Sequence, residues 1–292
     1  MSGWTIGILG GSGLYEIDAL EDAQWIAVDT PWGAPSDELL VGRIERVKFV
    51  FLPRHGRGHR LPPGAINYRA NVDALKRAGC TDIVAISAVG SLREQLEPGR
   101  FAIVDQFVDR THARDTSYFG PGLVAHVSVA DPVCPRLSAL AADAAEAAGA
   151  PVARGATYLA MEGPQFSTGA GSRLYRTWGC DVIGMTGSPE YKLAREAELP
   201  YALVGMVTDY DCWREECEPV AVAEIVARLN ANADTARRLV VELARRFPET
   251  REPSPIDTNL DAALSTAPEA RDPALLARLD AICGRALGGA QA

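Results

Sequence analysis

The sequence predicts an α/β protein built on a mixed, largely parallel β-sheet. Short apolar runs alternate with helix-like patterns along most of the chain, which is typical of this fold class. Glycine-rich or charged motifs follow directly after several apolar runs, where open α/β sheets hold ligands. The composition fits this class, because 47% of the 292 residues are hydrophobic and 23% are charged, enough to bury a large core.

The expected strands are short apolar runs bounded by glycine, proline or polar residues. They span residues 4–9, 25–28, 39–41, 47–52, 83–86, 101–108, 157–161 and 201–208. Helices are expected where apolar residues recur at helical spacing or where capping residues begin a segment. They span residues 67–78, 135–148, 188–197 and 220–247, followed by a proline-containing linker at 251–257 and a short terminal helix at 274–287. We therefore divide the chain into a main domain over residues 1–250 and a C-terminal helical extension over 251–292.

Charge and cysteine usage exclude several functional classes. The net charge is −9 and no run of lysine or arginine occurs, which argues against a nucleic-acid partner. No uncharged stretch is long enough to span a bilayer, and no secretory signal is recognisable before Arg43, so we expect a cytoplasmic protein without membrane association. Six cysteines without a CxxC pair, and only four histidines, predict reduced thiols and no metal site. A Cys212–Cys217 disulfide stays open as an alternative.

Three segments after predicted strands are suited to anion contact. The first is the Gly-Gly-Ser-Gly run that contains Ser12, whose glycines let backbone N–H groups approach an anion closely. The second holds Arg54, which could grip a phosphate bidentately, and His55, a further donor. The third begins with Ser87 and Ala88. Each alone could be a tight turn, a solvated loop or a packing turn, but together they favour a phosphate site. The spacing lacks the third glycine of a dinucleotide fingerprint, which disfavours NAD.

A carboxylate pair follows the last predicted strand. Asp209 and Asp211 are two residues apart, so an extended backbone would point both side chains in one direction. Such a pair suits acid catalysis or paired hydrogen-bond recognition. An acidic loop or an Asx turn is the structural alternative.

Taken together and in this order, the motifs resemble the 5′-methylthioadenosine phosphorylases of the purine nucleoside phosphorylase family. The resemblance covers about residues 4–247 and is carried by Gly10-Gly11-Ser12-Gly13-Leu14, Arg54-His55-Gly56, Asn67-Tyr68, Gly90-Ser91-Leu92-Arg93-Glu94, Asp105-Gln106-Phe107-Val108-Asp109-Arg110-Thr111, Glu162-Gly163-Pro164, Arg176-Thr177-Trp178-Gly179 and Thr208-Asp209-Tyr210-Asp211-Cys212-Trp213. The tail beyond Pro248 is similar to extensions of some bacterial members.

The resemblance implies the fold and the reaction. It implies a single-domain nucleoside phosphorylase fold over residues 1–250, with a mixed central sheet flanked by helices. Family members cleave a purine nucleoside with inorganic phosphate, a co-substrate, and release the base and a pentose 1-phosphate for methionine and purine salvage. They use no metal or organic cofactor and form homo-oligomers, either trimers or dimers of trimers.

The resemblance also assigns roles to individual residues. The phosphate site would comprise Ser12, Arg54, His55, Ser87, Ala88 and Thr186. The purine and ribose site would comprise Phe166, Ser167, Met185, Thr208, Asp209 and Asp211. The 5′ group would meet Val222, Ile225 and His126, the last supplied by a neighbouring subunit. Asp209 would donate a proton to purine N7. Without the resemblance, Met185 would be interpreted as a core residue and His126 as structural, while ordinary core is the alternative for Phe166.

The base preference leaves alternatives open. A protonated Asp209 can donate to N7 of adenine and accept from N6, whereas hypoxanthine offers acceptors at both positions, so the carboxylates favour 6-aminopurines. Gly184 and Gly187, however, resemble the 6-oxopurine relatives. An inosine, guanosine or methylthioinosine phosphorylase is therefore the alternative. A hydrolytic nucleosidase and a non-enzymatic nucleotide-binding module are further alternatives.

Overall fold

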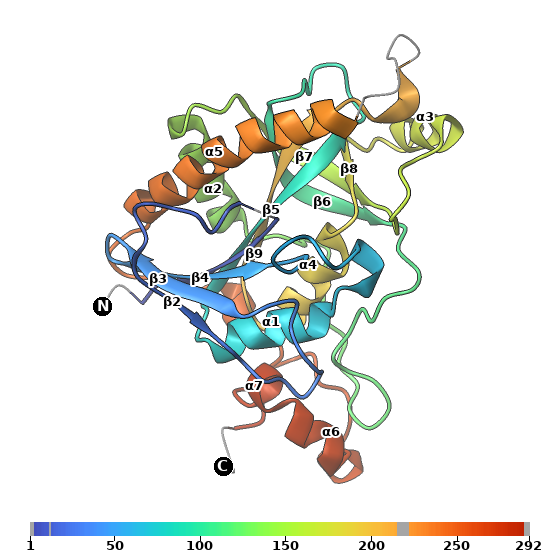
Figure 1. Ribbon diagram of the computed structural model, residues 1–292. Coiled ribbons are helices and arrows are strands. Elements are labelled where there is room, and N and C mark those ends of the chain that lie inside the picture. Colours follow the sequence, from blue (N-terminus) through green and yellow to red (C-terminus); the bar gives the residue numbers. More distant parts are fainter. Residues whose placement is uncertain (1–2, 12, 215–221, 289–292) are drawn as a thin grey trace.

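The computed structural model describes residues 3–11, 13–214 and 222–288, in which a single mixed sheet confirms the predicted α/β class (Figure 1). The strand order is β2-β3-β4-β1-β5-β8-β7-β6-β9. The strands are β1 (Thr5–Gly10), β2 (Glu21–Ile26), β3 (Leu39–Ile44), β4 (Val47–Pro53), β5 (Asp82–Ser91), β6 (Phe101–Asp109), β7 (Val152–Ala160), β8 (Val182–Gly184) and β9 (Tyr201–Asp209).

Half of this sheet closes on itself. β5 pairs with β8 through its last residues and also with β9 in parallel, so the pairings β5-β8-β7-β6-β9 return to β5. β1 joins β4 and β5 in parallel, with Gly10 opposite Pro53. The carboxyl ends of β1, β4 and β9 therefore meet beside the second half of β5, at one edge of the sheet.

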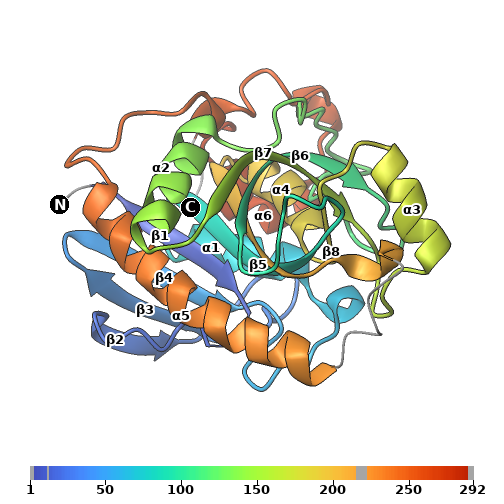
Figure 2. The same cartoon turned by 90° about the horizontal axis from the view of Figure 1, so that it is seen from above.

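Helices cover both faces of the sheet. They are α1 (Tyr68–Arg77), α2 (Pro135–Ala147), α3 (Gly169–Thr177), α4 (Gly187–Glu196), α5 (Val222–Arg246), α6 (Pro273–Arg278) and α7 (Asp280–Cys283). α2 and α5 pack together over one face, and α1 and α4 lie over the other (Figures 1 and 2). Leu239, Val240 and Leu243 of α5 are fully buried against the first face, and Leu75 and Leu193 against the second. In this arrangement the helix layers do not cover the carboxyl ends of the strands.

Most expected elements are present, and the differences have local causes. β8 and α3 were not predicted, because β8 is three residues long and α3 begins Gly-Ala-Gly, a poor helix-forming sequence. β5 runs on to Ser91, so the predicted anion segment at Ser87 lies inside the strand, not after it. The single terminal helix expected at 274–287 is split into α6 and α7, because Leu279 leaves helical geometry between them and is fully buried.

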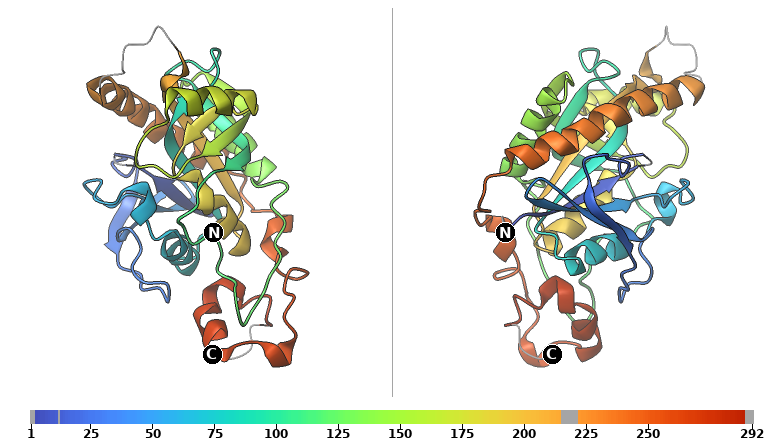
Figure 3. Two further views of the ribbon diagram at one scale, coloured as in Figure 1. Left: turned by 90° about the vertical axis from the view of Figure 1, so that its right-hand side faces the viewer. Right: turned by 60° about the vertical axis from the view of Figure 1, so that its left-hand side comes forward.

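Residues 251–288 run along the main body and pair with the loop that carries His126 (Figure 3). The backbone N–H of His126 donates to the Ala263 carbonyl at 2.9 Å, and the N–H of Ser265 donates to the Val124 carbonyl at 2.9 Å. Glu198, buried after α4, accepts hydrogen bonds from the Leu260 N–H and from Arg285. These contacts place the segment against the loop and α4; the division at residue 250 stays a proposal.

An ion pair anchors the start of this segment. The Asp82 carboxylate at the start of β5 is fully buried, and Arg251 Nε donates to its Oδ2 at 2.6 Å. Arg251 also contacts Asp257 through Nη1 and Nη2. The second cation at Asp82 is Arg136, whose Nη2 lies 3.5 Å from Oδ1.

Replacing Arg251 should therefore destabilise the protein. Arg251→Ala leaves the buried Asp82 carboxylate with one long contact, and we expect the free energy of unfolding to fall by about 3 kcal/mol. Chemical denaturation would measure it. Arg154→Ala is the matched control, because Arg154 pairs with Asp143 and Glu146 at the surface, and it should cost less than about 1 kcal/mol. Equal losses in the two variants would show that this pair does not anchor the segment.

Candidate active site

A cavity of about 510 Å³ opens at the edge where the carboxyl ends of the strands meet. Gly11 follows β1, Arg54 and His55 follow β4, and Asp209 ends β9; all of them line it. The second half of β5 contributes its residues from Ser87 to Gly90. The structure thus brings together most segments that the sequence analysis selected, in a cavity large enough for a small ligand.

Arg54 is held rigidly at the inner end of the cavity. Its side chain is 1% exposed, and Nε donates to Glu190 Oε1 while Nη2 donates to Glu190 Oε2 at 3.1 Å. Nη1 donates to the Ile86 carbonyl at 3.2 Å, and Nη2 also to the Leu9 carbonyl at 3.1 Å. A guanidinium has five N–H donors, so these four bonds leave one N–H of Nη1 for a ligand.

Glu190 is the counter-ion that the sequence analysis missed. Its carboxylate is buried beside Arg54 and also accepts a hydrogen bond from the Tyr201 hydroxyl at 3.1 Å. Burial lowers the pKa of Arg54, but the charge and hydrogen bonds of Glu190 outweigh burial, and the pKa is raised. The pair is neutral overall, so directional hydrogen bonds must hold much of an anion placed here. Glu190 lies in the first turn of α4, where an acidic residue is favoured by the helix dipole alone.

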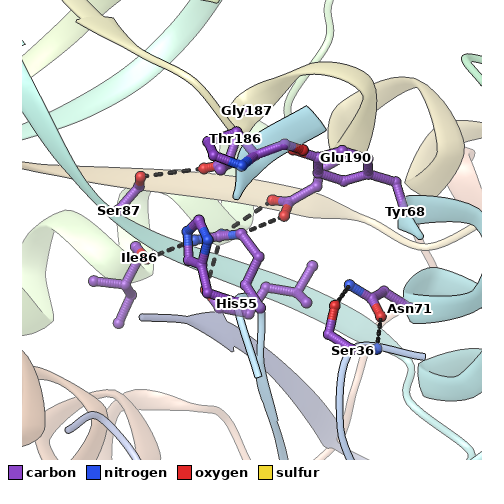
Figure 4. A network of polar contacts seen from close by, with 12 residues as sticks. Ser36, His55, Tyr68, Asn71, Ile86, Ser87, Thr186, Gly187 and Glu190 are labelled. Carbon is purple, nitrogen blue, oxygen red and sulfur yellow. Dashed lines mark hydrogen bonds and ion pairs between the residues drawn. The ribbon is translucent and has the colours of Figure 1, made fainter. Parts of the chain in front are cut away.

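Two hydroxyls stand beside Arg54. Ser87 Oγ lies 3.3 Å from Thr186 Oγ1, and both side chains are buried at the cavity wall (Figure 4). The backbone N–H groups of Thr186 and Gly187 donate to the Tyr158 hydroxyl at 3.3 Å each, which fixes this turn. A Cβ at Gly184 would lie 2.1 Å from the Tyr158 oxygen. The packing of Tyr158 therefore explains why Gly184 carries no side chain.

His55 faces the same end of the cavity as a neutral ring. Its Nδ1 lies 2.9 Å from the Leu61 carbonyl, and the ring stacks on His59 with 4.2 Å between centroids. Burial lowers the pKa of His55 to about 4, and the charge of Arg54 acts in the same direction. The imidazole is consequently uncharged at neutral pH.

The carboxylate pair lies at the opposite end of the lining. Asp209 Oδ1 accepts from the Asp211 N–H at 2.8 Å, and Oδ2 from the Thr208 hydroxyl at 2.7 Å. Asp211 has φ +49°, so the two side chains converge through a turn, and the extended geometry considered from the sequence is wrong. A Cβ at Gly90 would lie 3.1 Å from Asp209 Oδ1, so the glycine permits this close approach.

Asp211 is partly desolvated and has an unused oxygen. Among the described residues, nothing donates to its buried Oδ2. Burial raises the pKa of the Asp211 carboxyl and the nearby Asp209 carboxylate adds to this, although the Ser172 and Ser167 side chains oppose the shift. The raised pKa of the Asp211 carboxyl favours its protonated form compared with an ordinary carboxyl. The pair can therefore both donate to and accept from a ligand.

Arg114, which the sequence analysis did not select, orders the remaining wall. Its buried guanidinium donates to Glu162 Oε1 at 3.0 Å and to the Met185 and Ser188 carbonyls at 2.5 and 2.7 Å. Met185 and Phe166 both line the cavity. Phe166 is 73% exposed, so a flat ligand can stack on its ring. Ser167 follows Phe166, and its carbonyl accepts a hydrogen bond from the Cys212 thiol.

The other predicted residues fall elsewhere. His126 is exposed on the loop paired with residues 251–288 and does not line the cavity described here. Ser12 and Cys217 lie outside the described residues, and the same holds for the side chains of Val222 and Ile225 in the first turns of α5. Cys212 is a free thiol. No group of three potential metal ligands occurs in the described part of the chain, and no helix there is long and apolar enough to cross a membrane.

Known proteins resemble this chain along nearly its whole length. The family model of the phosphorylase superfamily matches residues 5–245. The S-methyl-5′-thioadenosine phosphorylase of Cereibacter sphaeroides is 60% identical over 97% of this chain and 99% of its own length. That of Bradyrhizobium diazoefficiens is 57% identical over 98% of this chain and 99% of its own length.

Solved structures agree with the sequence matches. The crystal structure of a methylthioadenosine phosphorylase from an antarctic soil metagenomic library superposes with a TM-score of 0.90 at 42% identity, covering 97% of this chain and 99% of that one. A mutant adenosine/methylthioadenosine phosphorylase of Schistosoma mansoni in complex with methylthioadenosine has a TM-score of 0.77 at 35% identity, covering 83% and 91%. The predicted family is confirmed, and the chain belongs to the phosphorylase superfamily.

Proposed function

We propose that the protein catalyses phosphorolysis of 5′-methylthioadenosine, and more weakly of adenosine, to adenine and the pentose 1-phosphate. The observation that carries this proposal is the joining of two chemistries in one cavity. Arg54, Ser87 and Thr186 offer donors for an anion, while Asp209 and Asp211 place two carboxyl groups where a base can bind. The names of the similar proteins support the same reaction.

The geometry accounts for the reaction steps. Adenine is a poor leaving group as an anion, and protonation at N7 lets it depart neutral. Asp209 is proposed as that donor, a contribution of about 10²–10⁴ in rate. The ribose becomes oxocarbenium-like as the bond to N9 breaks, and phosphate held at Arg54 and the two hydroxyls stabilises that charge before it attacks C1′. Attack from the face opposite the base inverts the anomeric centre.

Adenine is the preferred base in this proposal. The carboxylate pair can donate to N7 and accept from N6, which matches the donor–acceptor pattern of adenine. Gly184, which had suggested the 6-oxopurine alternative, is accounted for by the Tyr158 hydroxyl. At Gly187 a Cβ would lie 2.9 Å from the Phe107 ring and 3.1 Å from Tyr158. Side chains of β6, β7 and β9 leave no room for a Cβ at either glycine. The two glycines are thus explained by packing, and neither argues against adenine.

The assembly is proposed to be a trimer or a dimer of trimers in the cytoplasm. His126 is exposed away from its own cavity, and Leu174 and Trp178 of the α3 region expose large apolar side chains. A neighbouring copy could cover these side chains and bring its His126 to the 5′ end of the substrate, beside Val222 and Ile225. The free thiols of the described cysteines favour the cytoplasmic location.

Phosphate dependence tests the anion end. Removal of Arg54 should raise the KM for phosphate at least about 30-fold and also lower kcat, because the phosphate acts in the transition state. Arg54→Met combined with Glu190→Gln removes both charges of the buried pair and avoids an orphaned carboxylate. Arg57→Met is the control and should change neither value, because Arg57 is 44% exposed and pairs with Asp37 outside the cavity lining. Equal adenine release without phosphate would favour hydrolysis instead.

Asp209→Asn tests the acid. The amide keeps the shape but cannot transfer a proton, so kcat for methylthioadenosine should fall by about 10²–10⁴, while substrate binding changes little. For inosine or methylthioinosine the loss should be smaller, because the amide can donate to O6. Asp211→Asn should shift this preference less. Adenine release at the wild-type rate would show that Asp209 is not the acid.

Subunit mixing tests the role of His126. Oligomers of His126→Ala and of Asp209→Asn should each be impaired, but dissociation and joint reassociation should restore activity in up to about a quarter of the sites. Those sites combine an intact Asp209 with an intact His126 from the neighbouring subunit. Steady-state rates before and after mixing would show it. No recovery would contradict a site shared between subunits.

A further inference from the structure

We infer that His55 makes the cavity selective for oxyanions that keep a proton: its Nε2 accepts a hydrogen bond from the P–OH group of hydrogen phosphate. The inference rests on the proposed phosphorolysis, in which phosphate is the co-substrate, and it specifies the form of that anion. The class comprises tetrahedral dianions with one acidic hydrogen, such as hydrogen phosphate and hydrogen arsenate. Sulfate has the same charge and shape but lacks that hydrogen.

The loop geometry fixes which ring nitrogen carries the hydrogen. His55 Nδ1 lies 2.9 Å from the Leu61 carbonyl oxygen, which can only accept a hydrogen bond, so Nδ1 must be the donor. The Leu61 N–H donates in turn to the His55 carbonyl at 3.0 Å, so two bonds close this loop between the same residues. A neutral ring with its hydrogen on Nδ1 presents a lone pair at Nε2.

The surroundings keep this ring neutral. Arg54, the preceding residue of the chain, is a permanent buried cation, and the His59 ring stacks on the His55 ring. Arg60 is a further cation that lines the cavity. The nearby carboxylate, Glu190, is already paired with Arg54. Burial and the two basic neighbours lower the pKa of His55 to about 4, although the bond to Leu61 opposes them. At neutral and mildly alkaline pH, Nε2 therefore accepts a hydrogen bond and has no hydrogen to donate, while Nδ1 donates to Leu61.

A hydrogen-bond acceptor at His55 Nε2 favours an anion that carries an O–H group over one that carries none. The unprotonated oxygens of either anion can use the remaining Arg54 N–H and the hydroxyls of Ser87 and Thr186. Next to Nε2, an unprotonated oxygen of sulfate meets a lone pair, whereas hydrogen phosphate can turn its O–H toward the ring. The donor role considered for His55 from the sequence is thus replaced by an acceptor role in this inference. One hydrogen bond to a charged partner corresponds to a difference of about 10- to 100-fold in affinity.

Calorimetric titration of the full chain with inorganic anions, without nucleoside, tests the inference. The buffer is mildly alkaline, so that phosphate, sulfate and fluorophosphate are all dianions. Fluorophosphate carries fluorine in place of the hydroxyl group and has no proton to donate. We expect the wild-type protein to bind phosphate about 10- to 100-fold more tightly than either other anion. This comparison needs no substitution, so a variant that fails to fold cannot obscure it.

Substitutions then assign the selectivity to His55. His55→Phe keeps an aromatic ring against His59 but removes Nε2, so the phosphate-to-sulfate affinity ratio should fall below about threefold. His59→Phe keeps the stacked partner of His55 and should leave the ratio as in the wild type. The inference is overturned if the wild type binds none of the three anions or binds them within about threefold of one another. It is equally overturned if His55→Phe keeps the wild-type ratio.

Adenine release, measured in parallel, separates this inference from the proposed reaction. Selective phosphate binding without phosphate-dependent release of adenine would refute phosphorolysis and leave the anion selectivity standing. Phosphate-dependent release of adenine with equal affinities for phosphate and sulfate would refute the role of His55 and leave the reaction standing.

Discussion

The buried ion pair between Arg54 and Glu190 is the interaction on which the architecture of the cavity depends. Arg54 follows β4, Glu190 lies in the first turn of α4, and the remaining guanidinium bonds go to the Leu9 carbonyl of β1 and the Ile86 carbonyl of β5. The Tyr201 hydroxyl of β9 completes the set. Burying two charges carries a desolvation cost that their attraction offsets only when all other donors and acceptors are matched. Here the Leu9 and Ile86 carbonyls and the Tyr201 hydroxyl match all of them except one N–H of Arg54 Nη1, which remains for a ligand.

This pair also sets the electrostatic character of the cavity. One end holds a cation that is already neutralised, a neutral His55 and two hydroxyls. The other end holds two adjacent carboxyls, of which Asp211 is desolvated. An anion at the first end therefore meets directional hydrogen-bonding groups and a cation that already has a counter-ion. A base at the second end meets groups that can share a proton. The two ends suit a reaction that begins with a protonated anion and ends with a protonated base.

Residues without a ligand role keep these ends in place. Arg114 ties the Glu162 segment to the turn that carries Met185 and Ser188, and thus joins two walls of the cavity. The Tyr158 hydroxyl accepts the N–H groups of that turn and occupies the space over Gly184. Residues 251–288 hold the loop that carries His126 through backbone pairing. Each of these contacts joins segments that are far apart in the sequence.

The sequence by itself determined the fold class, most elements and the segments that form the cavity. These features arise from local causes: apolar periodicity, caps such as Asn67, and glycines or charged residues directly after strands. Only the tertiary structure decided which partners those segments meet. Glu190 and Arg114 carry no local signal of their roles, because the atoms that they contact come from strands and loops many residues away. The split of the terminal helix at the buried Leu279 and the turn that brings Asp211 toward Asp209 likewise depend on packing. The hydrogen position on His55 was set by the Leu61 carbonyl, because a ring nitrogen becomes donor or acceptor only when its neighbour in space is fixed.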